Sequence, residues 1–182
     1  MITERFHLEE PPPVPNKEEV RPTNQALIID PTGPRLMRWG LEVKWSKQPM
    51  INARAETLAE KPTFKSLLER RCIVPMTAYF EWRTDAKAKL KNTIVPDAAN
   101  GPFAFAGLSD GDAFTIVTCW PAASVAQIHS RMPVILDADH AARWADPNAG
   151  FDAVNSVLAP FTGEIASTED APPPLKQADL FG

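Results

Sequence analysis

Three short segments of this sequence carry side chains that could act on a substrate. Their central residues are an amide, a carboxylate and an imidazole, namely Asn52, Glu81 and His129. Glu81 stands between Phe80 and Trp82, and burial among aromatic rings raises the pKa of a carboxyl group and suits it to proton transfer near neutral pH. Taken singly, each residue has an ordinary role, as a turn amide, a half-buried ion-pair partner and a helix-end histidine. The chemistry therefore requires the three segments to converge.

Strands dominate the elements that would position these segments. Apolar and β-branched runs bounded by Gly, Pro, Asp and Asn predict the strands, and 103–108 and 113–119 should form a hairpin around 109–112. Asp137 is expected to cap a helix. We therefore expect an α+β fold with a curved, mainly antiparallel sheet. The predicted strands are 1–10, 26–30, 36–41, 72–75, 79–82, 103–108, 113–119 and 134–136, and the predicted helices are 62–70, 122–128, 137–144 and 151–158.

Composition limits the classes of protein that remain. The 182 residues suggest one domain with tails, and 44% hydrophobic residues are enough for a packed core. A net charge of −4 argues against a binder that relies on overall basic charge, so nucleic-acid contact would need a local basic cleft. Cys72 and Cys119 are predicted to be buried thiols, without the spacing of a disulfide or a metal site. The absence of an apolar signal or membrane segment predicts a cytoplasmic protein.

The ordered set of motifs resembles the SOS response-associated peptidase (SRAP) family. The three segments at 51–57, 80–82 and 128–133 follow in the family's order and at roughly its spacing. Further motifs agree, and the resemblance covers about residues 3–144; these motifs are 39–41 with 44–45, 60–64, 70–75 and 105–108. The resemblance implies a sheet that forms a pseudo-barrel with flanking helices. It also implies that single-stranded DNA binds in a positively charged cleft, where the ring-opened aldehyde of an abasic sugar reacts.

The same resemblance assigns roles around the reacting centre. By motif, Asn52 would orient the N-terminus, Glu81 would shuttle protons during imine formation, and His129 would assist opening of the sugar ring. The remaining assignments concern DNA binding. Taken alone, the arginines are ordinary surface or ion-pair residues, but the resemblance makes them contacts to phosphate, and it makes the tryptophan an aromatic that stacks on bases. These residues are Arg5, Arg54, Arg131 and Trp45.

The N-terminal motif departs from the family. The family's Cys-Gly-Arg-Phe is here Thr3-Glu4-Arg5-Phe6, so Thr3 takes the place of the cysteine. Because Ile2 is bulky, Met1 should be retained, and a thiazolidine, which needs an N-terminal aminothiol, cannot form. Three alternatives stay open: non-covalent binding, a reversible imine through the Met1 α-amine, whose pKa is about 7.7–8.0, with strand cleavage by β-elimination, or a different true start of the chain. Thr3 itself is a weak nucleophile.

The C-terminal residues suggest a protein partner. We expect a domain at 1–163 and a proline-containing tail at 164–182. Residues 177–181 read Gln-Ala-Asp-Leu-Phe, which resembles the pentapeptide by which bacterial DNA-handling proteins dock on the sliding clamp. Gln177 would hydrogen-bond in a small pocket, while Leu180 and Phe181 would fill an apolar one. The alternative is a tail that packs on its own domain.

These observations predict a DNA-damage-response protein that binds single-stranded DNA at abasic sites. We expect a monomer with no cofactor, no metal and no membrane contact. An enzyme-class alternative is a hydrolase or autoprotease, as the family's name implies, which would have Glu81 and His129 but no matching nucleophile. A non-enzyme alternative is a catalytically inactive interaction module of phage or SOS origin.

Overall fold

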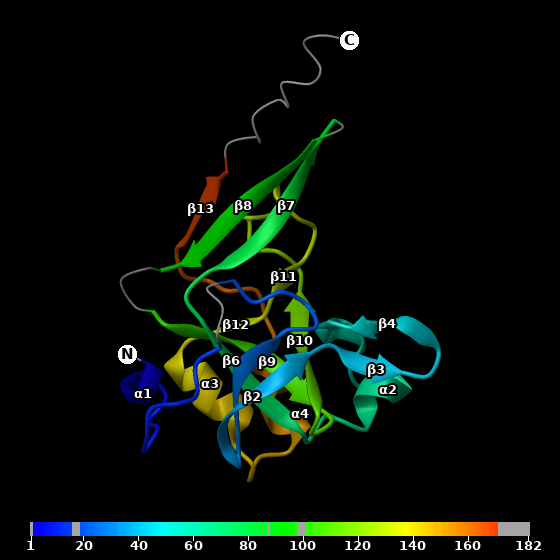
Figure 1. Ribbon diagram of the computed structural model, residues 1–182, viewed down its shortest axis with the longest axis vertical. Coiled ribbons are helices and arrows are strands. Elements are labelled where there is room, and N and C mark those ends of the chain that lie inside the picture. Colours follow the sequence, from blue (N-terminus) through cyan, green and yellow to red (C-terminus); the bar gives the residue numbers. More distant parts are fainter. Residues whose placement is uncertain (1, 16–18, 87, 98–100, 171–182) are drawn as a thin grey trace.

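The fold is built on a closed barrel of five strands (Figure 1). The computed structural model describes residues 2–15, 19–86, 88–97 and 101–170. Around the barrel the order is β10, β2, β1, β6 and β9, and pairing of β9 with β10 closes it. All these pairings are antiparallel except that of β10 with β2. The bounds are β1 Gln25–Asp30, β2 Gly33–Trp39, β6 Arg71–Met76, β9 Phe103–Ser109 and β10 Ala113–Cys119.

Short strands extend the barrel at the C-terminal half of β10. Strand β5 (Asn52–Arg54) runs parallel to β10, and β11 (Met132–Pro133) pairs with it antiparallel. Thr118 is the register partner of both Arg54 and Pro133. The end of β10 therefore brings together two segments that lie about 80 residues apart in the sequence. Strand β12 (Ile135–Leu136) continues from β11 and pairs with β9.

Two smaller sheets and several short helices surround the barrel. One sheet has the order β13–β8–β7 and lies above the barrel in Figure 1, and the other is the hairpin β3–β4. The strand bounds are β3 Leu41–Val43, β4 Ser46–Met50, β7 Tyr79–Asp85, β8 Ala88–Pro96 and β13 Ile165–Glu169. The α-helices are α1 Ile2–Arg5, α2 Pro62–Lys65, α3 Ala138–Ala145 and α4 Phe151–Val154, with 3-10 turns η1 Ala55–Thr57 and η2 Asn155–Val157.

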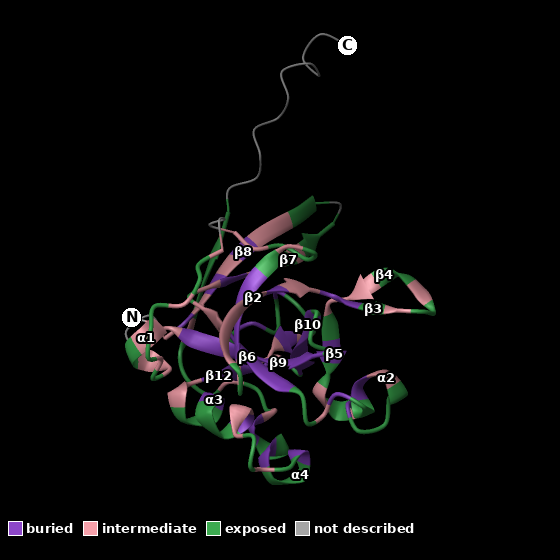
Figure 2. Cartoon of the chain, turned by 60° about the horizontal axis from the view of Figure 1, so that its bottom comes forward, coloured by how far each residue is buried: buried purple, intermediate pink, exposed green. Residues whose placement is uncertain are grey.

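The buried side chains concentrate in the barrel (Figure 2). Every residue of β9 and of β10 is buried. Gly107 permits a close approach of β6 to β9, because a Cβ at this position would lie 2.8 Å from the sulfur of Cys72. Both predicted thiols, Cys72 and Cys119, are indeed buried and free.

Arg71 connects the segments around α3 to the barrel through hydrogen bonds. Its side chain is only 4% exposed, and its guanidinium donates to the carbonyl oxygens of Trp144 (2.8 Å), Leu68 (2.9 Å) and Asp146 (2.9 Å). It also donates to the Glu69 carboxylate at 2.7 Å. A buried guanidinium is tolerated only when its donors are satisfied, as they are here, so Arg71 holds the loops around α3 against β6.

Most of the sequence-based elements are confirmed. The hairpin of β9 and β10 forms as predicted, and Asp137 caps α3 by accepting from the His140 amide at 2.8 Å. The strand expected at 1–10 is wrong, because 2–5 form α1, and the helix expected at 122–128 is a series of turns. The helix expected at 62–70 is α-helical only over Pro62–Lys65.

Several strands were not expected from the sequence, namely β4, β5, β8, β11 and β13. Strand β8 has Lys, Asn and Thr in its first half, which hides the alternation typical of a strand. Strand β13 lies in the part of the chain that was expected to be tail from residue 164, and it is ordered by pairing with β8 in the register Ile165–Pro96. Strand β8 forms a hairpin with β7, in which Asp85 pairs with Ala88. Only β13 depends on long-range pairing, which local sequence does not reveal.

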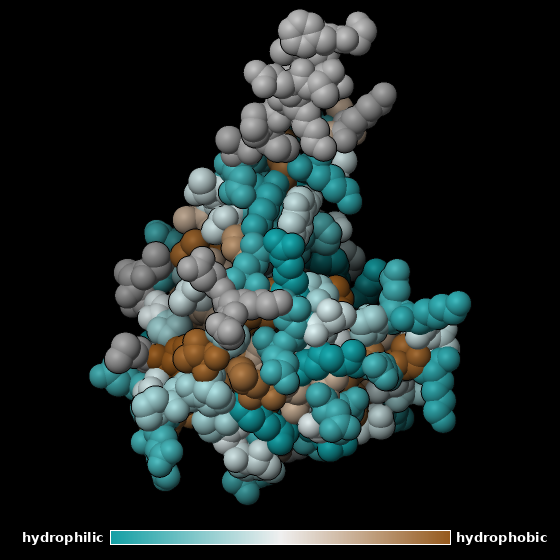
Figure 3. All heavy atoms as spheres, viewed as in Figure 1, coloured by the Kyte–Doolittle hydropathy of each residue, from teal (hydrophilic) through white to brown (hydrophobic). Residues whose placement is uncertain are grey.

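The surface is mostly polar where the smaller sheets project. Hydrophilic side chains predominate over β7, β8 and the β3–β4 hairpin in Figure 3. Within the residues that the structure describes, no helix has the length and apolar character needed to cross a membrane.

Replacement of Arg71 tests its structural role. We expect Arg71→Met to lower the free energy of unfolding by about 3 kcal/mol, because several buried carbonyl oxygens lose their donor. The melting temperature should fall by roughly 6–12 °C for a domain of this size, as measured by circular dichroism. The adjacent, exposed Arg70 is the matched control, and Arg70→Met should change stability little. Equal effects of the two substitutions would contradict the role of Arg71.

Candidate functional site

The site is organised around the last residues of β10. Pairing on both sides of this strand places Arg54 next to Thr118 on one side and Pro133 next to Thr118 on the other. The loop that precedes β11 carries His129 and Arg131. Two of the three segments that the chemistry requires therefore meet at one edge of the barrel.

Arg131 and Glu56 form a bidentate ion pair that fixes this edge. The Arg131 guanidinium donates to the two carboxylate oxygens of Glu56 at 3.0 and 2.8 Å, and to the carbonyl oxygen of Thr118 at 2.7 Å. The hydrogen bonds from Arg131 hold the pKa of Glu56 below its usual value. The predicted phosphate contact of Arg131 would have to compete with this pair.

Glu81 and His129 form the second charged unit. Burial raises the pKa of Glu81, as expected from its aromatic neighbours, while the nearby charge of His129 acts in the opposite direction. The Nδ1 atom of His129 lies 3.1 Å from the backbone nitrogen of Arg131 and 3.0 Å from its carbonyl oxygen. These contacts orient the ring and leave its Nε2 atom for other partners. The predicted acid and imidazole are therefore near enough for the charge of His129 to act on the pKa of Glu81.

Tyr79 lies beneath this unit. Its side chain is 7% exposed and packs edge-on against Phe105, with ring centroids 5.8 Å apart. Burial raises the pKa of Tyr79, and the charges of Glu81 and Cys119 raise it further. Its hydroxyl has no hydrogen-bond partner among the described residues. Tyr79 therefore links the Glu81 side of the site to Cys119 at the end of β10.

Asn52 and Arg54 share the exposed face of β5. Strand alternation buries Ala53 between them, and both flanking residues are open to solvent. The charge of Arg54 helps to lower the pKa of Glu56, after the larger effect of the hydrogen bonds from Arg131, so Arg54 lies beside the ion pair. No salt bridge engages Arg54 within the described part of the chain, which leaves its guanidinium available for a phosphate.

The N-terminal residues lie elsewhere. Thr3 and Arg5 belong to α1, which lies on the opposite side of the molecule from β5 (Figure 2). The Arg5 guanidinium lies 5.8 Å from the ring centroid of Phe103 and lines a pocket of about 430 Å³ together with Asp137. Phe6 next to it packs on the barrel core, which holds α1 in this position. The structure therefore does not bring Thr3 or Arg5 to Asn52.

The last predictions from the sequence concern Trp45, Met1 and the clamp-binding residues. Trp45 follows β3 at the turn into β4, and its side chain is 68% exposed. Met1 and the predicted clamp-binding residues are outside the described part of the chain; the latter are Gln177, Leu180 and Phe181. Among the described residues no group of three or more His, Cys, Asp or Glu side chains is arranged to hold a metal ion.

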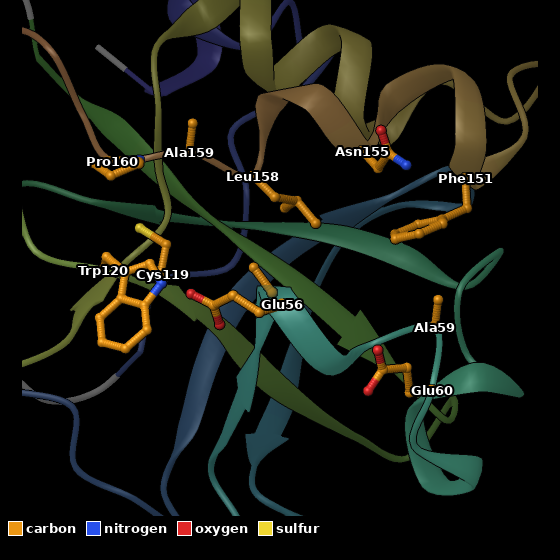
Figure 4. A pocket seen from close by; sticks show the side chains of 11 residues that line it. Glu56, Ala59, Glu60, Cys119, Trp120, Phe151, Asn155, Leu158, Ala159 and Pro160 are labelled. Atoms are coloured by element: carbon orange, nitrogen blue, oxygen red, sulfur yellow. The ribbon is translucent and has the colours of Figure 1, made fainter.

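Sequence reasoning missed two features of the site. Trp120, directly after β10, is 62% exposed, and the Arg131 guanidinium lies 5.1 Å from its ring centroid. Glu56 lies in the 51–57 segment, but nothing in the sequence marks it as the partner of Arg131. Both residues line a pocket of about 410 Å³ (Figure 4). A tryptophan that directly follows a β-prone, mostly apolar run was the available signal for this surface.

The sequence of this chain is similar to those of known proteins over most of its length. The family model described as SOS response associated peptidase (SRAP) matches residues 1–170. Abasic site processing protein YoaM of Bacillus subtilis is 40% identical over 158 residues, which cover 76% of this chain and 69% of that protein. Abasic site processing protein YoqW of the same organism is 40% identical over 166 residues, covering 80% and 74%. Abasic site processing protein YedK of Escherichia coli is 29% identical over 148 residues, covering 74% and 66%.

Solved structures agree with the fold. A protein from Bacteroides thetaiotaomicron, 28% identical in sequence, superposes with a TM-score of 0.70 over 81% of this chain and 74% of that one. A phage-related protein from Bordetella bronchiseptica, 22% identical, has a TM-score of 0.74 over 92% and 88% of the two chains. The predicted α+β fold with a curved, mainly antiparallel sheet that closes into a barrel is confirmed.

The raised pKa of Glu81 has a consequence for stability. The folded chain holds the Glu81 proton more tightly than the unfolded chain, so above the ordinary pKa of 4.5 unfolding releases this proton. The contribution of Glu81 to the free energy of unfolding is therefore present at low pH and is lost as the pH rises through the raised pKa of the folded state. We expect Glu81→Gln to match the wild type below about pH 4.5 and to melt about 2 °C higher near neutral pH, a small gain because solvent screens a partly exposed carboxyl.

The control for this measurement is Glu10→Gln, which alters an exposed carboxyl group that forms no ion pair with the described residues. Its melting curves should follow those of the wild type at every pH. A Glu81→Gln variant that is less stable than the wild type near neutral pH would show that the carboxylate is stabilised in the fold.

Proposed function

The chain belongs to the SOS response associated peptidase (SRAP) family, and from this membership we propose that it binds single-stranded DNA at abasic sites. Relatives of 40% identity are named abasic site processing proteins. The observation that carries the proposal is the Glu81–His129 unit, in which a carboxyl group of raised pKa lies beside an imidazole at an edge that also presents Arg54.

This unit suits proton transfer on an abasic sugar. Opening of the sugar requires the anomeric hydroxyl to lose a proton and the ring oxygen to gain one, while the C1′–O4′ bond breaks and the C1′ carbonyl forms. A protonated Glu81 can supply a proton, and a neutral His129 can accept one. His129 and Asn52 are exposed residues, and the Nε2 atom of the first and the amide of the second are suited to hydrogen-bond the opened sugar.

Local charge would guide the DNA backbone. The chain has a net charge of −4, so attraction of DNA must come from particular side chains rather than from the whole molecule. Arg54 is suited to contact a phosphate, and Trp45 presents a largely exposed ring on which a base can stack. Arg131 would contact phosphate only by giving up part of its pairing with Glu56.

We propose non-covalent capture as the mode of binding. Thr3, at the position of the family's cysteine, lies on α1 and away from β5 (Figure 2). An imine through an N-terminal amine would require this segment to move to the Glu81–His129 unit. The peptidase alternative needs a nucleophile, and the nearby Cys119 is poorly suited, because burial raises its pKa to about 11 and keeps the thiol protonated. Docking on a sliding clamp through Gln177, Leu180 and Phe181 stays a prediction from the sequence.

A gel-shift assay tests the proposal with single-stranded DNA that carries one abasic site. We expect binding about tenfold tighter than to undamaged DNA, the gain from one or two hydrogen bonds to the opened sugar. His129→Ala should remove this preference, whereas Arg54→Ala should weaken both complexes alike. Arg143→Ala, on the exposed face of α3, should change neither.

Borohydride distinguishes the modes of capture. We expect no band that survives denaturation after borohydride treatment, and a trapped band would instead establish an imine. Equal affinity for abasic and undamaged DNA would contradict the proposed function, and no shift even at low salt would contradict DNA binding altogether.

A further inference from the structure

Trp120 presents an aromatic surface that the proposed function does not yet use. It follows β10 directly, and its side chain is 62% exposed, although the six residues before it are all buried. Arg131 lies against its ring, with the guanidinium carbon 5.1 Å from the centroid. Because the Glu56 ion pair fixes Arg131, the ring is held in place while most of its surface remains open.

A pocket of about 410 Å³ extends from Trp120 toward α4 and η2 (Figure 4). Leu158 and Pro160 give it apolar walls, and Phe151 lies at the end far from Trp120. Its polar groups are the carboxylates of Glu56 and Glu60 and the amide of Asn155. The pocket thus combines a flat aromatic ring, apolar walls and a few hydrogen-bonding groups.

This lining fits a nucleobase rather than the DNA backbone. Glu56 is paired with Arg131, which leaves Glu60 as the carboxylate that repels a phosphate and can accept a hydrogen bond from an exocyclic amine of adenine, cytosine or guanine. The apolar walls and the indole ring match the faces of a base, which stack on aromatic side chains. The position is also suitable, since Arg131 joins Trp120 to the loop that carries His129.

We propose that this pocket takes an unpaired base next to the abasic sugar, and that the base stacks on Trp120. The inference rests on the proposed function, because it assumes that the sugar lies at the Glu81–His129 unit. The site would then make two kinds of contact with DNA: Arg54 binds the backbone, and Trp120 stacks on a base. A base that carries an exocyclic amine is preferred over thymine, which has none.

The test is a thermodynamic cycle between Trp120 and the flanking base. Fluorescence anisotropy is measured with oligonucleotides in which the abasic site is flanked by adenine, by thymine, or by a second abasic position, on the 5′ or the 3′ side in turn. Trp120→Ala should weaken binding about tenfold when the base is present, the usual loss for one stacked base. With the base absent from the relevant side, the substitution should have no effect.

Further variants identify the parts of the pocket. Trp120→Phe keeps an aromatic ring and should retain most of the affinity. Glu60→Gln should reduce the preference for adenine over thymine without changing the affinity for DNA that lacks the flanking base. Trp82→Ala removes another exposed tryptophan, on the opposite face of β7 from Glu81, and should not depend on the flanking base. Melting curves of each variant establish that it is folded.

The outcomes separate this inference from the proposed function. A loss in Trp120→Ala that is equal with and without the flanking base, on both sides, would overturn the base pocket, because Trp120 would then act only through Arg131. Suppose instead that Trp120→Ala weakens binding only when the flanking base is present, but that the protein binds undamaged and abasic DNA equally. This result would support the pocket and overturn the proposed function. No dependence of wild-type affinity on either flanking base would also overturn the pocket.

Discussion

The pairing of β10 on both sides of its C-terminal half is the constraint on which the rest of the site depends. Strand β5 approaches from one side and β11 from the other, with Thr118 as the common register partner. A shift of one residue in either pairing would turn Arg54 or the residues before Pro133 to the other face of the sheet. Because β10 is wholly buried and also closes the barrel with β9, its register is fixed by the core.

The site that this pairing positions contains two charged units, Arg131–Glu56 and Glu81–His129, and their properties differ. The Arg131–Glu56 pair is bidentate and partly buried, so it organises the loop around His129 and supports Trp120. The Glu81–His129 unit has an acid whose charge is opposed by burial and favoured by the imidazole. The first unit is therefore suited to position groups, and the second to exchange a proton. Both lie within a chain of net negative charge, so the site must act through local contacts.

The sequence predicted the parts of this arrangement that depend on neighbours along the chain. The cap at Asp137 and the hairpin of β9 and β10 follow from local patterns. The raised pKa of Glu81 has the expected direction but comes from burial of its own face of β7, not from Phe80 and Trp82, which alternate to the other face. The ion pair of Arg131 with Glu56 joins residues 75 positions apart, and no local pattern encodes such a pair. Strand β13 arises in the same way, from pairing with the distant β8. Helix α1 has only four residues and is held by packing of the chain beside it, which explains why its type was mistaken.

The most direct test of this account is a carbon-13 NMR titration of the Glu81 carboxyl group in the wild type and in His129→Gln. The account predicts that the wild-type midpoint lies above the ordinary glutamate value of 4.5, and that it moves higher when the imidazole is removed, because the charge of His129 favours the carboxylate. A midpoint at the ordinary value that does not respond to His129→Gln would show that the two side chains do not form one unit, and the proposed site would lose its basis.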